Sequence, residues 1–131
     1  MGWTLSPWVR RLCLLLLCAA YLQGGLVKAF DFAGAVAEMQ HFGIAPAAPM
    51  TLAVIVLELG ASALVISGRL RWLGALVLAA FTLGATLVAL RFWDMPQPQR
   101  FMAANAFFEH LGLVGGFLLV AGLDGRGRRH G

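Results

Sequence analysis

The segment MTLAVIVLELGASALVIS, residues 50–67, contains a single charged side chain, that of Glu58. A helix needs about 20 mostly apolar residues to cross roughly 30 Å of hydrocarbon, because it rises about 1.5 Å per residue. Other segments of similar length and apolar character lie on both sides of it along the chain. The four predicted membrane spans are residues 12–30, 50–67, 72–90 and 105–123. The sequence therefore predicts an all-α integral membrane protein built as a four-helix bundle.

The composition also favours a membrane location. The chain has 131 residues, of which 60% are hydrophobic and 12% charged, and its mean hydropathy is +0.82. A soluble domain of this size has no room to bury so much apolar surface, so lipid must cover it. Because the segments between the spans are short, residues 1–131 are predicted to form one domain, ending in a basic, disordered tail over residues 125–131.

The basic residues indicate how the chain is oriented. One group lies before the first span, between the second and third spans, or after the fourth: Arg10, Arg11, Arg69, Arg71, Arg126, Arg128 and Arg129. Lys28, Arg91 and Arg100 lie at the opposite ends of the spans. Because cytoplasmic loops carry an excess of Lys and Arg, both termini are predicted to be cytoplasmic. The net charge of +4 then serves orientation and contact with the lipid bilayer, and nucleic acid is not predicted as a partner.

The start of the chain, two arginines followed by an apolar run, also resembles a signal peptide. The run continues past Ala20 as far as Phe30, and its removal would leave three spans. We therefore expect the first span to be retained. Its two cysteines, Cys13 and Cys18, are five residues apart and so point to different helix faces, as packed or lipid-facing thiols.

The longest loop, residues 31–49, is predicted to be external and to contain a short helix. Asp31 is a suitable N-cap, and apolar residues recur at helical spacing from Phe32 to Phe42. Gly43 is suited to ending a helix, and two prolines follow it. We expect a short amphipathic helix that lies at the outer interface or folds over the mouth of the bundle.

Ionisable side chains within a span normally face the interior of the bundle and have partners, because exposing them to lipid costs free energy. Glu58 lies near the middle of the second span, on the same face as Thr51 and Ser62. The third span has a stripe of small and weakly polar residues on one face: Ala75, Ala79, Thr82 and Thr86. Both stripes are predicted to face the interior.

The fourth span also carries a polar stripe. Four of its residues recur at intervals of three or four and so share one face: Asn105, Glu109, Gly112 and Gly116. The two glycines form a GxxxG motif, which lets a neighbouring helix approach closely. We therefore expect this face to be the packed one. His110 points about 100° away from Glu109 around the helix.

These polar groups together form the candidate site. Those in the outer half of the bundle or at its outer rim are Gln23, Lys28, Arg91, Asn105, Glu109 and His110, and Glu58 lies below them. We infer a polar cavity, open toward the outside, that would hold a ligand, a quinone or a proton. In the alternative interpretation these groups only hydrogen-bond the helices together, with Glu58 paired to Lys28, Arg91 or a threonine hydroxyl.

No metal site is predicted. Glu109 and His110 are adjacent rather than three or four residues apart, so one helix face cannot present both to a metal ion. The sequence also lacks a CxxC motif, a nucleophile–base motif and the glycine-rich loops that hold phosphates or dinucleotides. Catalytic residues are not identifiable from it.

The first two spans carry motifs that resemble the DoxX family of membrane proteins. Two arginines lead into a first span that ends in Gly24-Gly-Leu-Val-Lys28. The second span contains Glu58 and is followed by Gly68-Arg-Leu-Arg71. Both resemble the helix ends of that family.

The last two spans extend the resemblance to about residues 10–123. The third span has the aromatic exit Leu90-Arg-Phe-Trp93, and the fourth begins with Asn105-Ala-Phe-Phe-Glu-His-Leu-Gly112. This last motif departs from the family pattern, because Glu109-His110 stands where the family has a Lys-Asn pair. The change reverses a charge in the proposed cavity.

The resemblance implies a multi-pass protein of the bacterial inner membrane. Some relatives associate with redox partners in thiosulfate:quinone oxidoreduction or oxidative-stress complexes, and more distant ones resemble chaperones or cargo receptors. It therefore implies a membrane subunit of a redox or oxidative-stress system with a quinone as candidate ligand. Its partner would be a redox protein or a second copy of the chain. No intrinsic cofactor is implied, and whether the chain is itself an enzyme stays open.

Two alternatives remain. A non-enzymatic assembly, chaperone or interaction protein would use the first external loop and the GxxxG face as contact surfaces. A small-molecule transporter or channel would require oligomers, because four short spans without a broken helix leave little room for alternating access.

Overall fold

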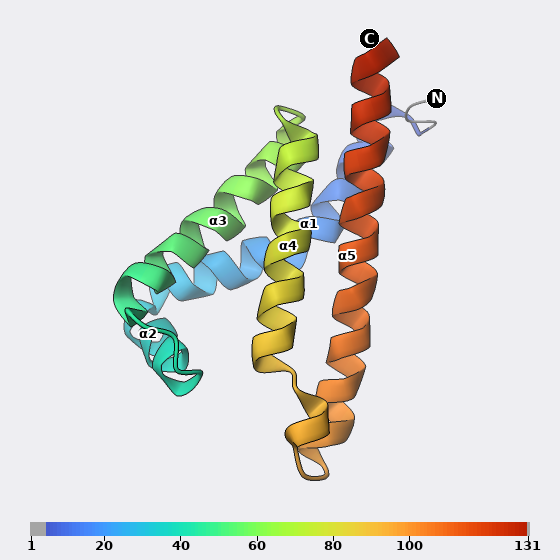
Figure 1. The fold of residues 1–131 in the computed structure, drawn as a ribbon. Helices are drawn as coiled ribbons and strands as arrows, with labels where there is room; N and C mark the ends of the chain where they lie inside the picture. The colour runs from blue at the N-terminus through green and yellow to red at the C-terminus, as the bar shows by residue number, and fades with distance from the viewer. Residues whose placement is uncertain (1–4, 131) are drawn as a thin grey trace.

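The computed structural model describes residues 5–130, and the side chains of residues 5–124. Over this range the regular structure is entirely helical (Figure 1), which confirms the all-α prediction. The elements are α1 (Pro7–Phe30), α2 (Phe32–His41), α3 (Ala47–Ser67), α4 (Arg71–Ala89), the 3₁₀ helix η1 (Phe92–Asp94) and α5 (Gln99–His130).

Four of these helices, α1, α3, α4 and α5, are long and apolar enough to cross a membrane. They coincide with the four predicted spans, so the chain is a multi-pass membrane protein. α1 begins at Pro7, ahead of the predicted span, because proline in the first turn has a suitable φ and needs no hydrogen bond for its nitrogen.

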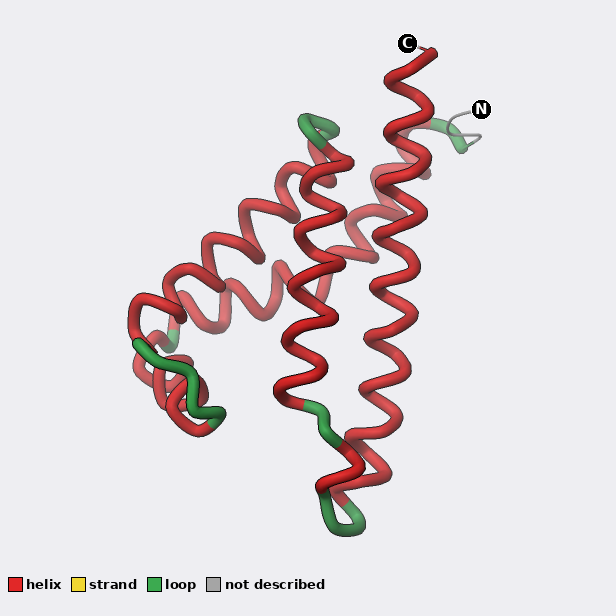
Figure 2. Tube along the Cα trace, in the orientation of Figure 1, coloured by secondary structure: helices red, strands yellow, loops and turns green. Residues whose placement is uncertain are grey.

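The four long helices form a V. α4 and α5 lie side by side, and α1 lies against α3 (Figure 2). α3 also packs against α4 near the turn that joins them, but it diverges from α4 further along (Figure 1). α2 packs on α3 at the far side of the opening. We call the end with the α3–α4 turn, the start of α1 and the end of α5 the closed end, and the opposite one the open end.

The buried core lies where the four long helices meet. Phe117 of α5 is fully buried and meets Tyr21 of α1 edge to face, with ring centroids 5.4 Å apart. Val65 of α3 and Leu78 of α4 are fully buried in the same cluster. The Tyr21 hydroxyl is hydrogen-bonded to the hydroxyl of Thr82, so neither buried polar group is left without a partner.

The α3–α4 turn holds its two helices close together. α3 ends at Ser67, and the next residue, Gly68, has a φ of +90°, which suits glycine because it lacks a Cβ. One turn into α4, a Cβ on Gly74 would lie 2.7 Å from the carbonyl oxygen of Ala61. Arg71 is buried, and its Nε donates a hydrogen bond to the carbonyl of Val65 at 2.7 Å. This bond satisfies one of the carbonyls left without an intrahelical partner at the end of α3.

A short helix, α2, lies between α1 and α3. Asp31 caps it, since its Oδ1 accepts a hydrogen bond from the backbone N–H of Gly34 at 3.1 Å. The helix ends at His41, and Gly43 follows with a φ of +73°. Ala35 is its buried residue, so α2 rests on the neighbouring helices through a small face.

The packed face of α5 differs from the predicted one. Its buried residues are Ala103, Phe117, Val120 and Asp124. The predicted stripe is mostly exposed: a Cβ on Gly112 would meet nothing within 4 Å, and one on Gly116 would meet only the side chain of Leu17, at 3.4 Å. The large ring of Phe117 gains more from burial than the small stripe does, and this sets the rotation of the helix.

The backbone of α5 is helical as far as His130, through a segment that the sequence predicts to be a disordered tail. Extending an existing helix by one residue costs much less than starting a new one, so a helix can continue beyond its apolar part. Gly131 lies outside the described residues.

Candidate ligand site

An ion pair joins α1 to α3 at the open end of the V. The ammonium of Lys28 donates a hydrogen bond to Oε1 of Glu58 at 2.8 Å. The Glu58 side chain is 6% exposed and that of Lys28 is 25% exposed, so the pair is accessible from its lysine side. A buried carboxylate needs such a partner, because an unpaired charge in a low-dielectric interior is strongly destabilising. Of the partners predicted for Glu58, Lys28 is confirmed.

Two glycines of α1 allow this pair to form. A Cβ on Gly24 would lie 3.2 Å from Oε2 of Glu58, and one on Gly25 would lie 2.8 Å from the side chain of Leu59. A larger residue at Gly25 would push α1 away from α3 and lengthen the contact between Lys28 and Glu58. The Gly-Gly pair therefore positions the ion pair by letting the two helices approach closely.

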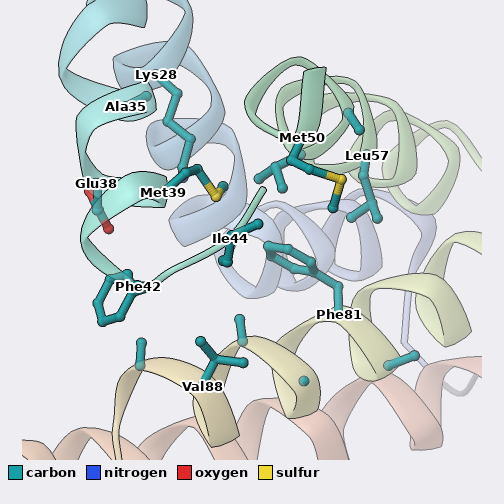
Figure 3. A pocket seen from close by; sticks show the side chains of 16 residues that line it. Lys28, Ala35, Glu38, Met39, Phe42, Ile44, Met50, Leu57, Phe81 and Val88 are labelled. Carbon is teal, nitrogen blue, oxygen red and sulfur yellow. The ribbon is translucent and has the colours of Figure 1, made fainter. Parts of the chain in front are cut away.

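A groove of about 470 Å³ opens beside the ion pair, with α2 and α3 on one side and α4 on the other. Figure 3 shows Met50 and Leu57 of α3 facing Phe81 and Val88 of α4 across it. Met50 and Val88 are both exposed, so the groove opens to the surroundings of the protein. In a membrane, its apolar walls would face lipid chains.

Lys28 belongs to both the ion pair and the groove. Of the residues that line the groove, only Lys28 and Glu38 are charged. Lys28 also lines a smaller cavity of about 170 Å³, together with Asp31 and Gly34 at the start of α2. The arrangement suits a ligand with a long apolar part and a hydrogen-bond acceptor, since apolar pockets with few polar groups bind such molecules. The ammonium would be the donor.

Two further hydrogen bonds join α4 to its neighbours. Thr82 bonds Tyr21 of α1, and the hydroxyl of Thr86 lies 2.9 Å from Nδ1 of His110 on α5. Both threonines are buried, as the predicted stripe on the third span requires. Together with the Lys28–Glu58 pair, these bonds connect all four long helices through polar side chains.

The other predicted site residues are not gathered around one cavity. Gln23, Arg91, Asn105 and Glu109 are exposed, and Arg91, which follows the end of α4, donates through Nε to the carbonyl of Leu87 in that helix. Of the predicted site residues, Lys28 lines the groove beside the ion pair, and the rest of that lining is apolar except for Glu38. Among the described residues, no three His, Cys, Asp or Glu side chains lie close enough together to hold a metal ion.

Asp124 has a structural role that its place at the end of a span does not reveal. Its Oδ2 accepts a hydrogen bond from the backbone N–H of Trp72 at 3.1 Å, so α5 caps the start of α4. The sequence does carry a signal for this face. Ala103, His110, Phe117 and Asp124 are seven residues apart, the interval at which residues recur on a helix contact face.

Residues 11–91 of the chain match the family model DoxX. The match covers more than half of the 131 residues. The chain belongs to the DoxX family. The resemblance drawn from the sequence motifs is thus confirmed. Comparison with curated proteins and with solved structures found no match.

The DoxX match places the ion pair and the groove within the family region. Residues 11–91 include both Lys28 and Glu58 and both walls of the groove. The matched region ends before α5, so the motif that begins at Asn105 and contains Glu109-His110 lies beyond it.

Proposed function

We propose that this DoxX family protein is the membrane subunit of a quinone-linked redox system, and that the groove between α2–α3 and α4 is its quinone site. The observation that carries the proposal is the 470 Å³ apolar groove with the Lys28 ammonium at its edge. Quinones combine an apolar isoprenoid tail with a ring that bears two carbonyl acceptors. The groove and the ammonium match these two parts.

Each residue of the site has a role in this proposal. The aliphatic and aromatic side chains of α3 and α4, such as Met50 and Phe81, would contact the ring and the start of the tail. Lys28 would donate a hydrogen bond to a ring carbonyl, and Glu58 holds its ammonium in place. A quinone takes up two electrons and two protons on reduction to the quinol, and a partner redox protein would supply the electrons.

Photolabelling with an azido-benzoquinone that carries an isoprenoid tail tests the site directly. The purified full-length protein is irradiated in mild detergent, and labelled peptides are mapped by mass spectrometry. We expect labels on the peptides that contain Met50 and Phe81. Labels confined to α5 would contradict the proposal.

A matched pair of glycine variants sharpens this test. A Cβ on Gly84 or on Gly60 would meet nothing within 4 Å, but only Gly84 lines the groove. Gly84→Leu therefore fills the groove without disturbing the packing, and we expect it to reduce labelling at least tenfold. Gly60→Leu should label like the wild type. Equal labelling of both variants would exclude the groove as the site.

We propose that the protein resides in a bacterial inner membrane with the closed end on the cytoplasmic side. Arg10, Arg11, Arg69 and Arg71 support this orientation, since cytoplasmic ends of spans are enriched in basic residues. α2 and the mouth of the groove would then face the outer leaflet. Accessibility of a cysteine introduced at Glu38 to a membrane-impermeant thiol reagent in intact cells, in a variant without the native cysteines, tests the orientation.

The exposed face of α5 favours a second candidate, a non-enzymatic assembly or interaction protein. Within the spanning segment of α5, 11% of the residues are buried, compared with 33% for α3 and for α4. Glu109 lies on this helix with its side chain exposed, although a carboxylate facing lipid is costly. A partner helix with a basic or donor side chain would cover it.

Crosslinking in native membranes tests this second candidate. A photoreactive residue replaces Leu119 of α5, which is 70% exposed, or Leu16 of α1, which is 66% exposed and serves as the matched control. A protein crosslinked at position 119 but not at position 16 would support an interface on α5. Lipid adducts alone at both positions would exclude it.

A further inference from the structure

A second cavity, of about 170 Å³, adjoins the groove where α1 is followed by α2. We call it the side cavity. Lys28, Ala35 and Glu38 line both the groove and the side cavity, so the two spaces meet at these residues. Figure 3 shows all three on the side of the groove that α1 and α2 form. A ligand in the groove can therefore extend into the side cavity past Lys28.

The side cavity differs from the groove in its chemistry. Its lining includes three charged residues, Lys28, Asp31 and Glu38, whereas the larger groove has only Lys28 and Glu38 among apolar side chains. Lys28 lies in the last turn of the spanning helix α1, where water and headgroups begin to replace hydrocarbon. An amphiphilic ligand would thus place its polar end in the side cavity and its apolar part in the groove.

The side cavity offers both a hydrogen-bond donor and acceptors. The Lys28 ammonium has three N–H groups, and it donates to Oε1 of Glu58. The Asp31 carboxylate accepts the backbone N–H of Gly34 through Oδ1. Within the described part of the chain, the Glu38 side chain has no hydrogen bond or ion pair. Glu38 is therefore the acceptor most available to a ligand.

These groups restrict the class of polar head that fits. A phosphate or a fatty-acid carboxylate would lie beside the carboxylates of Asp31 and Glu38, and like charges in contact repel each other. A neutral hydroxyl can accept a hydrogen bond from the ammonium and donate one to a carboxylate. A carbonyl oxygen can only accept, so it would leave its lone pairs facing a carboxylate. The side cavity therefore favours a neutral head that bears hydroxyl groups.

We propose that the side cavity holds the ring of the ligand, and that Glu38 makes the site prefer the reduced quinol to the quinone. This inference rests on the quinone site proposed above for the groove. A ring hydroxyl of the quinol accepts from Lys28 and donates to the Glu38 carboxylate, and hydrogen bonds to charged groups are stronger than neutral ones. Glu38 is then a residue that determines specificity for the redox state of the ligand.

Calorimetric titration of the full-length protein in mild detergent tests this preference. The probes are a decyl-tailed benzoquinone and its quinol, with oxygen excluded. We expect the wild type to bind the quinol about fivefold more tightly, as one hydrogen bond to an accessible charged group would give. Glu38→Gln should bind the quinol about fivefold more weakly and the quinone at least as tightly, because the amide can donate to a carbonyl. A purely structural defect would weaken both ligands alike.

Asp94→Asn is the matched control for the loss of one negative charge. Asp94 is exposed in η1 at the open end and lines neither the groove nor the side cavity. This variant should keep the preference of the wild type for the quinol. The same loss of preference in Asp94→Asn and Glu38→Gln would show an effect of net charge and would overturn the role of Glu38.

The titration also separates a failure of this inference from a failure of the quinone site. If the wild type binds both ligands equally, or if Glu38→Gln keeps the preference for the quinol, the role of Glu38 is wrong and the quinone site stands. If the wild type binds neither ligand, the quinone site is wrong, and the inference is overturned with it. Glu38 is exposed, so its replacement by the isosteric glutamine should leave the fold intact.

Discussion

The two ends of the V use charged side chains in opposite ways. At the closed end, Arg71 and Asp124 bond to backbone atoms of other elements, the carbonyl of Val65 and the N–H of Trp72. At the open end, Lys28 and Glu58 bond to each other, and Lys28 also faces a cavity. Charges that bond to backbone atoms secure the helix termini. The Lys28–Glu58 pair leaves its ammonium available to a ligand.

Two glycines of α4 show the same contrast on one helix. A Cβ on Gly74 would lie 2.7 Å from the Ala61 carbonyl, whereas one on Gly84 would meet nothing within 4 Å. α4 is therefore close-packed at the closed end and forms a cavity wall at the open end. A glycine in an apolar span thus has two distinct uses, and only its surroundings distinguish them.

Replacing these two glycines by leucine should give the largest difference between the ends. Gly74→Leu forces α3 and α4 apart against backbone atoms, so we expect it to lower the free energy of unfolding by more than about 3 kcal/mol or to prevent folding. Gly84→Leu should change it by less than about 1 kcal/mol, because space is available and leucine favours the helix. Thermal unfolding in mild detergent measures both. Similar midpoints for the two variants would show that the close approach at Gly74 is not needed.

Removing the charge of Lys28 should lower the free energy of unfolding more than removing the charge of Glu58. Lys28→Gln leaves a buried carboxylate without its cation, and we expect a loss of about 3 kcal/mol. Glu58→Gln leaves an ammonium that is 25% exposed and can reach solvent or headgroups, so the loss should be about 1 kcal/mol.

The double variant Lys28→Gln/Glu58→Gln is the control for this asymmetry. With both charges removed, we expect its stability to return to within about 1 kcal/mol of the wild type. Additive losses in the double variant would show that the two side chains stabilise the protein through separate contacts.

The spans and their inward-facing stripes could be predicted because they depend on local pattern. Residues 50–67 are apolar enough to require lipid, and Thr51, Glu58 and Ser62 are buried on one face as their spacing indicates. Cys13 is exposed and Cys18 buried, as expected for residues on different faces. The sequence left three candidate partners for Glu58, namely Lys28, Arg91 and a threonine hydroxyl. The choice among them depends on how closely α1 approaches α3, which the sequence does not reveal.

The orientation of α5 could not be predicted by the same reasoning. The polar stripe through Glu109 was expected to face inward because lipid exposure is costly, yet the packed face follows Phe117 and Asp124. Two faces of this helix compete for the interior, the polar stripe through Glu109 and the face with Phe117. Burying the large ring of Phe117 gains more free energy than burying the stripe, whose polar residues lie near the end of the span. Asp124 and Arg71 bond to backbone atoms of other elements, and such bonds have no counterpart in sequence spacing.

Removal of the cap at the closed end should have an intermediate effect. Asp124→Ala deletes the acceptor for the Trp72 N–H and the acid beside Arg71, and we expect a loss of about 1–2 kcal/mol. Asp124→Asn keeps an acceptor oxygen and should cost less. Thermal unfolding in detergent ranks the two variants. If Asn were as destabilising as Ala, the charge beside Arg71 rather than the hydrogen bond would be responsible.

The smallest effect is expected at the bond between Thr86 and His110, which joins α4 to α5 toward the open end. Thr86→Val keeps the shape of the side chain and removes the hydroxyl, so it should cost about 1 kcal/mol. His110 is only half-buried, which limits the cost of leaving its Nδ1 without a partner. A double-mutant cycle with His110→Phe separates this bond from other contacts of either residue. A coupling energy near zero would mean that this hydrogen bond does not stabilise the contact between α4 and α5. That contact would then depend on the packing of the two helices and on the bond of Asp124 at the closed end, and the two ends of the V would differ further.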